Sequence, residues 1–539
     1  MAAMSTLPVS LLPASRPQPL IPQRKLIKKG GYTRQRRGCL TCRQRKKKCD
    51  QGLPICGHCS RLNLVCKHEK PREVVSSAGG EDAASGSAGS EARQHWDYDN
   101  SISPQGDNVS EVLKVSKIFE PLDFVRPKDS VDHLTSSRRT MMRYYTSTLA
   151  IMLSATAENN CFLSVLLPMA FDCATLLDAM AAWSSAHLAL RDPSFHNVSL
   201  QHRGRVLSNL SAALNSNNLS GEMCLAITMA MCSMETISDA TTSGWAHHLF
   251  GAAAVLQSGS SDVPEGALQK SRTIINSYWL ESVERKWLVR NFAYHDILMS
   301  VSLDRRPLIT GDYWMSADDE MADPYFAFAS KIMLLTSEIS VLNVDCAEYE
   351  QSLHDGNSPG EDDYASIFEG LPSSSTYDTF LQRARSIADE LREWQCPAVS
   401  ADTPLGFLSQ TYQSAGLIYL HYVLQKYFPQ HSADILTEGI DVYVESVCDA
   451  AQRVPEGSLA ECSLLFPLFI AGGEAKNATH IERIKNRLYT MNKWRRFRNV
   501  NACREVLEEL WKQRGELKET ETIGWRDVVR QRGWQLALS

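Results

Sequence analysis

Two cysteine-rich stretches organise this sequence, Cys39-Leu-Thr-Cys42-Arg-Gln-Arg-Lys-Lys-Lys-Cys49 and Cys56-Gly-His-Cys59-Ser-Arg-Leu-Asn-Leu-Val-Cys66. The unit C-x2-C-x6-C therefore occurs twice in succession. A two-residue gap lets two thiolates hold one metal ion from a single turn of the chain, and zinc prefers thiolate ligands. Four sulfurs complete one tetrahedron, so six complete two only when two thiolates are shared. The spacing predicts a compact pair of zinc ions held by Cys39, Cys42, Cys49, Cys56, Cys59 and Cys66.

Three other interpretations of the cysteines were weighed. Paired cysteines in a chain without a secretion signal are more often metal ligands than disulfide bridges. An iron–sulfur cluster also uses thiolates, but it takes four ligands at other spacings. Chance clustering of structural cysteines does not account for a repeated spacing. We therefore favour the zinc pair, and we expect it to be structural because thiolates fill every coordination position.

These stretches resemble the DNA-binding domain of the fungal Zn2Cys6 binuclear-cluster transcription factors. The resemblance covers about 30 of the 539 residues. It implies that the first and fourth cysteines, Cys39 and Cys56, bridge the two zinc ions. It also implies that residues three and four positions after the second cysteine, Arg45 and Lys46, read base edges, and that the DNA sites contain CGG triplets. The function expected from it is sequence-specific regulation of RNA polymerase II genes, with activation favoured.

The charge distribution agrees with a DNA-binding head. Residues 1–49 contain many Lys and Arg but no Asp or Glu, whereas the whole chain has a net charge of −6. A basic N-terminal segment on an otherwise acidic chain is typical of a protein that binds a polyanion through that segment. Arginine and lysine suit guanine, whose O6 and N7 both accept hydrogen bonds in the major groove. Besides the two base readers, we expect phosphate or solvent contacts from Arg43, Lys47, Lys48, Arg36 and Arg37.

Changes in composition divide the chain into four parts. We expect a disordered basic arm over 1–33, the zinc-cluster domain over 34–70, a flexible linker over 71–111 and an all-α domain over 112–539. The linker is rich in Ser, Gly and Ala between Ser76 and Ser90. No apolar heptad follows the cluster, so the sequence leaves homodimer formation open.

The long C-terminal part has the apolar periodicity of helices and no sustained strand alternation. The sequence predicts helices over 139–153, 175–190, 274–301, 380–394, 412–428, 435–454 and 502–511. This part resembles the second class of fungal-specific regulatory domain found behind the same zinc clusters. The matching stretches are Asn160–Ala170, Leu177–Leu190, Tyr294–Ser302, Phe466–Ala475, Glu505–Trp511 and the closing Gly524-Trp-Arg-Asp with Gly533-Trp-Gln-Leu. The resemblance implies an α-helical regulatory domain without a shared catalytic site, and we expect transcription co-regulators to bind through it.

The sequence contains little that indicates a membrane protein or an enzyme. The longest apolar run, Leu464–Ala471, contains Pro467 and is too short to cross a membrane, so we expect a soluble nuclear protein. No phosphate-binding loop, HExxH or GxSxG motif is present. His247 and His248 are adjacent and so make a poor metal pair on a helix. The single acids Asp239, Glu281 and Asp296 are expected to be caps or surface groups. The alternatives kept are a nuclear scaffold that touches DNA non-specifically and an all-α enzyme with a zinc-cluster head.

Overall fold

The computed structural model divides the chain into two compact units, Met1–Tyr98 and Asp99–Ser539, which are described separately. It describes Cys49, Cys56 and residues 136–216, 218–239, 243–258, 275–315, 322–354, 376–397, 400–516 and 522–539. Of the first unit, therefore, only the two cysteines are described. All elements below belong to the second unit.

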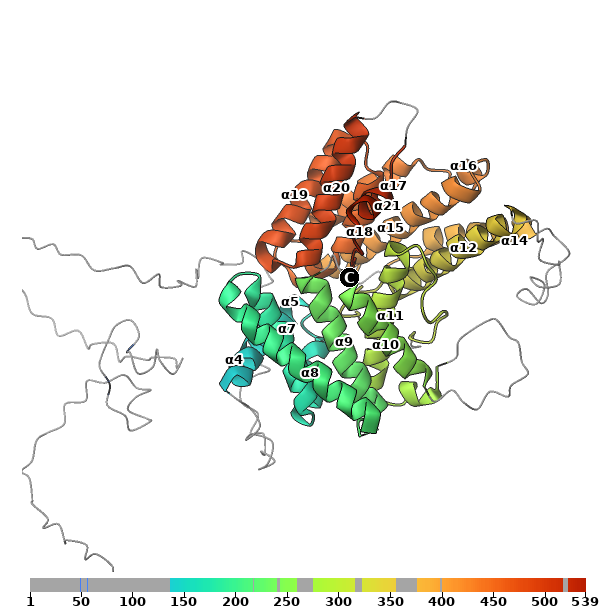
Figure 1. Cartoon of the computed structure of the whole chain (residues 1–539). Coiled ribbons are helices and arrows are strands. Elements are labelled where there is room, and N and C mark those ends of the chain that lie inside the picture. The colour runs from blue at the N-terminus through green and yellow to red at the C-terminus, as the bar shows by residue number, and fades with distance from the viewer. Residues whose placement is uncertain are drawn as a thin grey trace, which may run out of the picture. The chain divides into compact units, whose positions relative to one another are not determined.

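The first group of helices in the second unit packs around α7 and α9 (Figure 1). Its elements are α4 (Ser136–Tyr144), the π-helical turn η1 (Tyr145–Leu149), α5 (Ala150–Met152), the π-helical turn η2 (Phe162–Leu166), α6 (Leu167–Phe171), α7 (Ala174–Ala189), the 3-10 turn η3 (Pro193–Phe195), α8 (His196–Ser216), α9 (Gly221–Ser238), α10 (Gly244–Gln257), the 3-10 turn η4 (Ser277–Leu280) and α11 (Val283–Ser302). Helix α9 is buried from Cys224 to Ile237, on every side. Its N-terminus is capped by Ser220, whose Oγ accepts the N–H of Met223.

The second group of helices follows the chain from residue 330 onward (Figure 1). Its elements are α12 (Ser330–His354), α14 (Thr376–Glu393), α15 (Pro404–Tyr427), α16 (Ser432–Ile435), α17 (Ile440–Arg453), the 3-10 turn η5 (Leu459–Ser463), α18 (Leu465–Glu474), α19 (Ala478–Arg495), α20 (Arg498–Glu516) and α21 (Trp525–Arg532). Helices α14 and α17 bury one face and expose the other, whereas α18 is buried along its apolar length. Pro467 lies in the first turn of α18, where its missing N–H has no helical partner to lose.

The last described residues join the two groups. After α21 the segment Trp534–Ser539 has no helical structure, and Leu536, Ala537 and Leu538 are buried (Figure 1). The carbonyl of Gln535 accepts the indole N–H of Trp245 at 3.3 Å, and the carbonyl of Leu536 accepts the hydroxyl of Ser302. One hydrophobic core therefore extends from Tyr145 to Leu538.

The predicted fold class is confirmed: the second unit is a large helical domain. Its described residues contain no strand, and a single isolated bridge pairs Asp323 with Ala327. Several predicted helices differ in extent. The helix expected over 412–428 begins at Pro404, the one expected over 502–511 runs from Arg498 to Glu516, and the one expected over 139–153 is divided by η1. The helix expected over 274–301 begins at Val283, after a 3-10 turn, and the one expected over 435–454 begins at Ile440, after the short α16. No described helix is long and apolar enough to pass through a lipid bilayer.

Candidate zinc centre and nucleic-acid interface

The predicted zinc ligands are described at two positions. The Cys56 side chain has an exposed fraction of 0%, and Cys49 is half-buried. The other four ligands, Cys39, Cys42, Cys59 and Cys66, lie outside the described residues. The donor set of six thiolates fits zinc. When bound, zinc supplies cross-links that hold a short segment folded.

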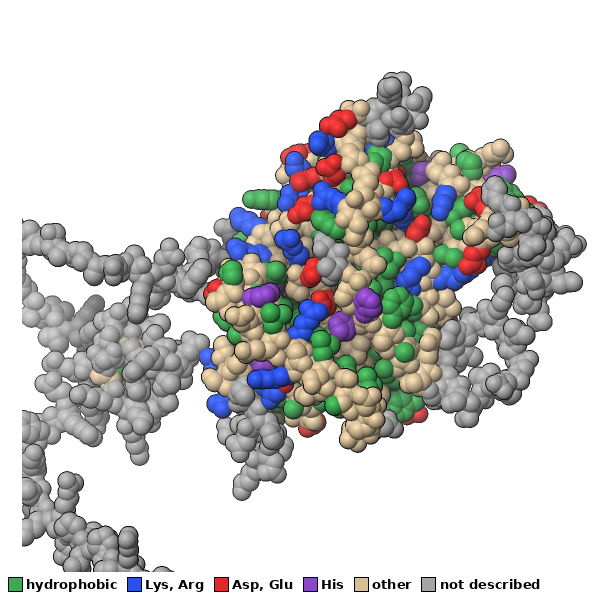
Figure 2. All heavy atoms as spheres, viewed as in Figure 1, with side chains coloured by type: hydrophobic (Ala, Val, Ile, Leu, Met, Phe, Trp, Pro, Cys, Tyr) green, Lys and Arg blue, Asp and Glu red, His purple; other side chains and the backbone are tan. Residues whose placement is uncertain are grey.

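The predicted DNA-contacting side chains also lie outside the described residues. They are Arg36, Arg37, Arg43, Arg45, Lys46, Lys47 and Lys48. The helical domain offers a contrast in charge. On the face seen in Figure 2, its Lys and Arg side chains are interspersed with Asp and Glu and form no continuous basic area. The basic segment within the cysteine cluster therefore remains the predicted nucleic-acid interface.

Cysteines of the helical domain do not compete as zinc ligands. Cys161, Cys346 and Cys448 are buried, and burial raises the pKa of each of these thiols to about 12. A buried thiol with such a pKa stays protonated and is a poor ligand at neutral pH. Among the described residues no group of three or more Cys, His, Asp or Glu side chains is placed to hold a metal ion. The prediction that these cysteines act as small hydrophobic residues is confirmed for most of them.

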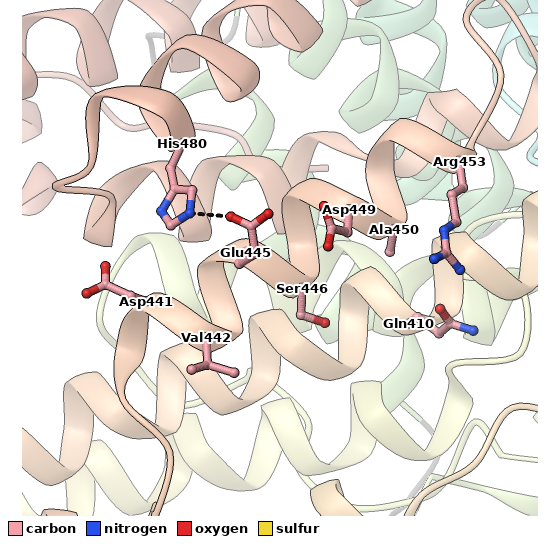
Figure 3. Close-up of a pocket in the computed structure, with 9 residues that line it drawn as sticks. All are labelled: Gln410, Asp441, Val442, Glu445, Ser446, Asp449, Ala450, Arg453 and His480. Atoms are coloured by element: carbon pink, nitrogen blue, oxygen red, sulfur yellow. Dashed lines mark hydrogen bonds and ion pairs between the residues drawn. The ribbon is translucent and has the colours of Figure 1, made fainter.

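A groove of about 580 Å³ lies on the helical domain between α15, α17 and α19 (Figure 3). Asp441, Glu445 and Asp449 project from successive turns of α17, and the ring of His480 of α19 points at Glu445. Such a cluster of acids beside a histidine resembles general acid–base machinery, which sequence reasoning did not point to. Its spacing of four residues along α17 is the signal that was present in the sequence.

The contacts in this groove are those of an ion-pair network. Glu445 accepts hydrogen bonds from Nε2 of His480 and, at 2.5 Å, from Nη1 of Arg483. Nη2 of Arg483 donates to Asp449 at 2.5 Å, and this bond holds the pKa of Asp449 below its ordinary value. Ser446 accepts from Ser414 at 2.9 Å. The carboxylates thus hold α17 and α19 together.

Two further groups singled out in the sequence have structural partners. His248 is largely buried, with its Nε2 3.9 Å from Glu235, and burial lowers the pKa of His248 to about 4. A ring nitrogen of His247 is 2.7 Å from the carbonyl of Ser243.

The expectation for Asp296 was partly wrong. Asp296 is fully buried rather than on the surface, since it pairs with Arg305 at 3.0 Å and caps the backbone N–H groups of Leu308 and Ile309 at 2.9 and 3.1 Å.

The chain thus carries a cysteine cluster with an enclosed basic segment and a large helical domain. The sequence matches the fungal Zn(2)-Cys(6) binuclear cluster domain over residues 37–73 and the fungal specific transcription factor domain over residues 140–539. The chain therefore belongs to the fungal zinc-cluster transcription factors. The family resemblance stated from the sequence is confirmed, and with it the assignment to zinc-binding, DNA-binding regulators of transcription.

Several curated proteins resemble the chain. Transcriptional activator protein UGA3 of Saccharomyces cerevisiae is 25% identical over 374 residues, which cover 59% of this chain and 67% of UGA3. TY1 enhancer activator of the same organism is 65% identical over 37 residues, and transcriptional regulatory protein pro1 of Neurospora crassa is 50% identical over 40 residues. These two matches cover 7% of this chain and only 5% and 6% of the relatives. No solved structure matches the chain.

Proposed function

We propose that the chain activates RNA polymerase II genes in the nucleus by binding CGG-containing DNA sites through a two-zinc cluster. The repeated cysteine spacing with its enclosed basic segment is the observation that carries the proposal. Six thiolates hold two zinc ions, which fix the segment Arg43–Lys48 so that it can enter the major groove. The name of transcriptional activator protein UGA3, which matches 59% of this chain, supports the activating role.

Within the basic segment, the side chains are proposed to have separate tasks. Arg45 and Lys46 bind the O6 and N7 acceptors of guanine and determine sequence preference. Arg43, Lys47 and Lys48, with Arg36 and Arg37 of the preceding arm, bind phosphates and determine the salt dependence of affinity. The helical domain has a regulatory role and binds co-regulators; no catalytic role is proposed for it.

Substitution of single lysines in the full-length protein tests the separation of tasks. Lys46→Ala is expected to reduce discrimination between a CGG site and a scrambled duplex by about 1–3 kcal/mol. Lys48→Ala is expected to weaken binding to both duplexes alike and to lower the slope of log affinity against log salt by about 1. Fluorescence anisotropy at several fixed salt concentrations measures both effects. Equal effects of the two substitutions on both duplexes would contradict the assignment.

Binding-site selection with the full-length protein tests the proposal as a whole. A CGG triplet in the selected DNA supports it, and a pair of triplets at fixed spacing shows that two copies bind together. Selection of no motif, with affinity for all duplexes, identifies the chain as a scaffold with non-specific DNA contact. A reporter gene carrying the selected site then separates activation, which is expected, from repression.

A further inference from the structure

A small cavity lies where the two groups of helices meet. Its volume is about 50 Å³, and its wall is contributed by α7, α9, α11, the residues around Tyr325, the start of α20 and Ser539. The described residues that line it are mostly aromatic or aliphatic and include no Lys, Arg, Asp or Glu. The composition of this wall is that of a small-molecule site, largely apolar with a few placed polar groups, while the volume is well below the roughly 300–1,000 Å³ of pockets for drug-sized ligands.

Two hydrogen-bond donors in the wall have no partner among the described protein atoms. They are the indole Nε1 of Trp183 and the hydroxyl of Tyr325, whose residues are only 1% and 5% exposed. Both rings pack against Phe162, with centroids 6.0 and 5.7 Å from it. A buried donor without a partner is costly, and most buried polar groups in proteins have one. Because both residues line the cavity, an acceptor bound there is a candidate partner for both groups.

Another polar side chain in the wall, His295, is already satisfied by the protein. Its Nε2 contacts the hydroxyl of Ser233 at 3.2 Å, and its Nδ1 contacts the hydroxyl of Ser539 at 2.7 Å. Asn499 donates to the carbonyl of Ser539 at 2.6 Å and extends this chain of bonds to α20. Burial lowers the pKa of His295 to about 4, so the ring is neutral at pH 7. The side chains of the wall therefore supply donors but no charge.

We propose that this cavity binds a small neutral carbonyl compound, whose oxygen accepts hydrogen bonds from Trp183 and Tyr325. A charged ligand is disfavoured because burying an ion without a counter-charge is costly. The volume accommodates about four non-hydrogen atoms, if each takes the space of one water. The ligand contacts both groups of helices and so stabilises their junction. The proposal deepens the function proposed above, because a molecule that binds here would be an effector of the regulatory domain.

Acetamide is a suitable probe, because it has four non-hydrogen atoms and a carbonyl oxygen, and acetate is its charged counterpart of equal size. Full-length, zinc-loaded protein is studied by saturation-transfer NMR and by thermal unfolding. Acetamide at about ten times its dissociation constant is expected to give saturation transfer and to raise the unfolding temperature by about 1–2 °C. Acetate at the same concentration is expected to do neither.

Two substitutions place the binding in the cavity. Tyr325→Phe and Trp183→Phe each remove one donor and keep an aromatic ring, and each is expected to weaken acetamide binding about tenfold. Tyr427→Phe and Trp287→Phe are matched controls, since these residues also have a buried polar atom without a partner but do not line the cavity. The controls are expected to bind acetamide as the wild type does.

Three results overturn the proposal. These are no saturation transfer from acetamide, equal binding of acetamide and acetate, and unchanged binding in both cavity variants. The first means that the cavity holds water only. If neither cavity variant folds, the contrast between acetamide and acetate on the wild-type chain decides. No DNA is present in these measurements, so their failure leaves the proposed DNA-binding function standing, and failure of site selection leaves the cavity proposal standing.

Discussion

At the scale of single residues, Asp178 shows how a buried charge is held in the helical domain. It has no exposed surface, and its carboxylate accepts hydrogen bonds from Nε of Arg138 at 2.6 Å and Nδ1 of His202 at 2.8 Å. Burial alone would raise the pKa of Asp178, but the bonds from His202 and Arg138 outweigh it, so the pKa lies below its ordinary value. The charged form of Asp178 therefore belongs to the folded state and connects α4, α7 and α8.

Replacement of Asp178 by asparagine is expected to lower the free energy of unfolding by about 3 kcal/mol at pH 7, because the buried end of Arg138 loses its counter-charge. A lowered pKa contributes stability that is complete above the ordinary value of 3.8 and is lost as the pH falls through the folded-state pKa. The contribution of the Asp178 carboxylate to this difference should thus be complete at pH 7 and be lost in strong acid. Urea denaturation at several pH values measures it.

An exposed pair gives the matched comparison. Asp389 bonds Arg392 at 2.5 Å, but Asp389 is 62% exposed. Asp389→Asn is expected to change the free energy of unfolding by about 0.5 kcal/mol or less, because solvent screens exposed ion pairs. If Asp178→Asn and Asp389→Asn lower the free energy of unfolding by the same amount, burial does not explain the contribution of Asp178 to stability.

At the scale of elements, two glycines let α18 pack closely. A Cβ added at Gly472 would lie 2.6 Å from Cδ1 of Leu507 in α20, and one at Gly473 would lie 2.6 Å from Cδ1 of Trp525 in α21. The Trp525 ring is fixed by Phe469, with the ring centroids 4.9 Å apart. It therefore has little freedom to move away, whereas the end of a leucine side chain has more.

Gly473→Ala is accordingly expected to destabilise the helical domain by about 2 kcal/mol. The control is Gly204→Ala in α8, where an added Cβ has nothing within 4 Å. That substitution is expected to stabilise by about 0.5–1 kcal/mol, because alanine is the better residue in a helix interior. Thermal denaturation followed by circular dichroism measures both. A stabilising Gly473→Ala would show that α18 and α21 are not closely packed in solution.

A single buried face made some of the helices easy to predict from the sequence. Helices α14 and α17 have one buried face, and the 3.6-residue period of their apolar side chains predicted both. Helix α9 is buried all round, and no helix was predicted there, but α7 is equally buried and was predicted over 175–190. Full burial alone therefore does not hide a helix in the sequence. Helices α11 and α17 also begin later than predicted, because a 3-10 turn precedes α11 and the short α16 precedes α17.

At the scale of the whole molecule, the chain combines a metal-dependent head with a helical domain that has its own core. A zinc chelator is expected to abolish DNA binding while the circular dichroism and unfolding temperature of the helical domain stay nearly unchanged, because zinc-thiolate bonds supply the folding free energy of the head alone. Low pH should act similarly on the head, since protons compete with zinc for sulfur. Loss of helical structure together with zinc would contradict this independence.

Single cysteine substitutions refine the same prediction. Cys56→Ser is expected to lower the zinc content from about two ions per chain to less than one, since the family resemblance makes Cys56 a shared ligand. Cys503→Ser is the control, because Cys503 is buried in the helical core and should leave the zinc content unchanged. Atomic emission on purified full-length protein measures both.

The sequence predicted the candidate zinc centre and could not predict the cavity, for one physical reason. The cysteine ligands lie within 28 consecutive positions, so their spacing is visible along the chain. The cavity wall combines Trp183, Tyr325 and Ser539 with residues from several other segments, and only tertiary packing brings these together. Likewise, the acids of α17 were visible in the sequence, but their cancellation by Arg483 was not.

The bonds that close the helical domain have a consequence for its biosynthesis. The guanidinium of Arg495 donates to the carbonyl of Met152, 343 positions earlier, and the carbonyl of Arg495 contacts His187, 308 positions earlier. At about 5–20 residues per second, a ribosome needs about 20–70 s to make the intervening chain. During that time the first helices emerge without the partners that cover them. Nascent chains of this protein should therefore depend on chaperones, and a premature stop codon just before Arg495 should yield a product that is degraded rather than a shorter regulator.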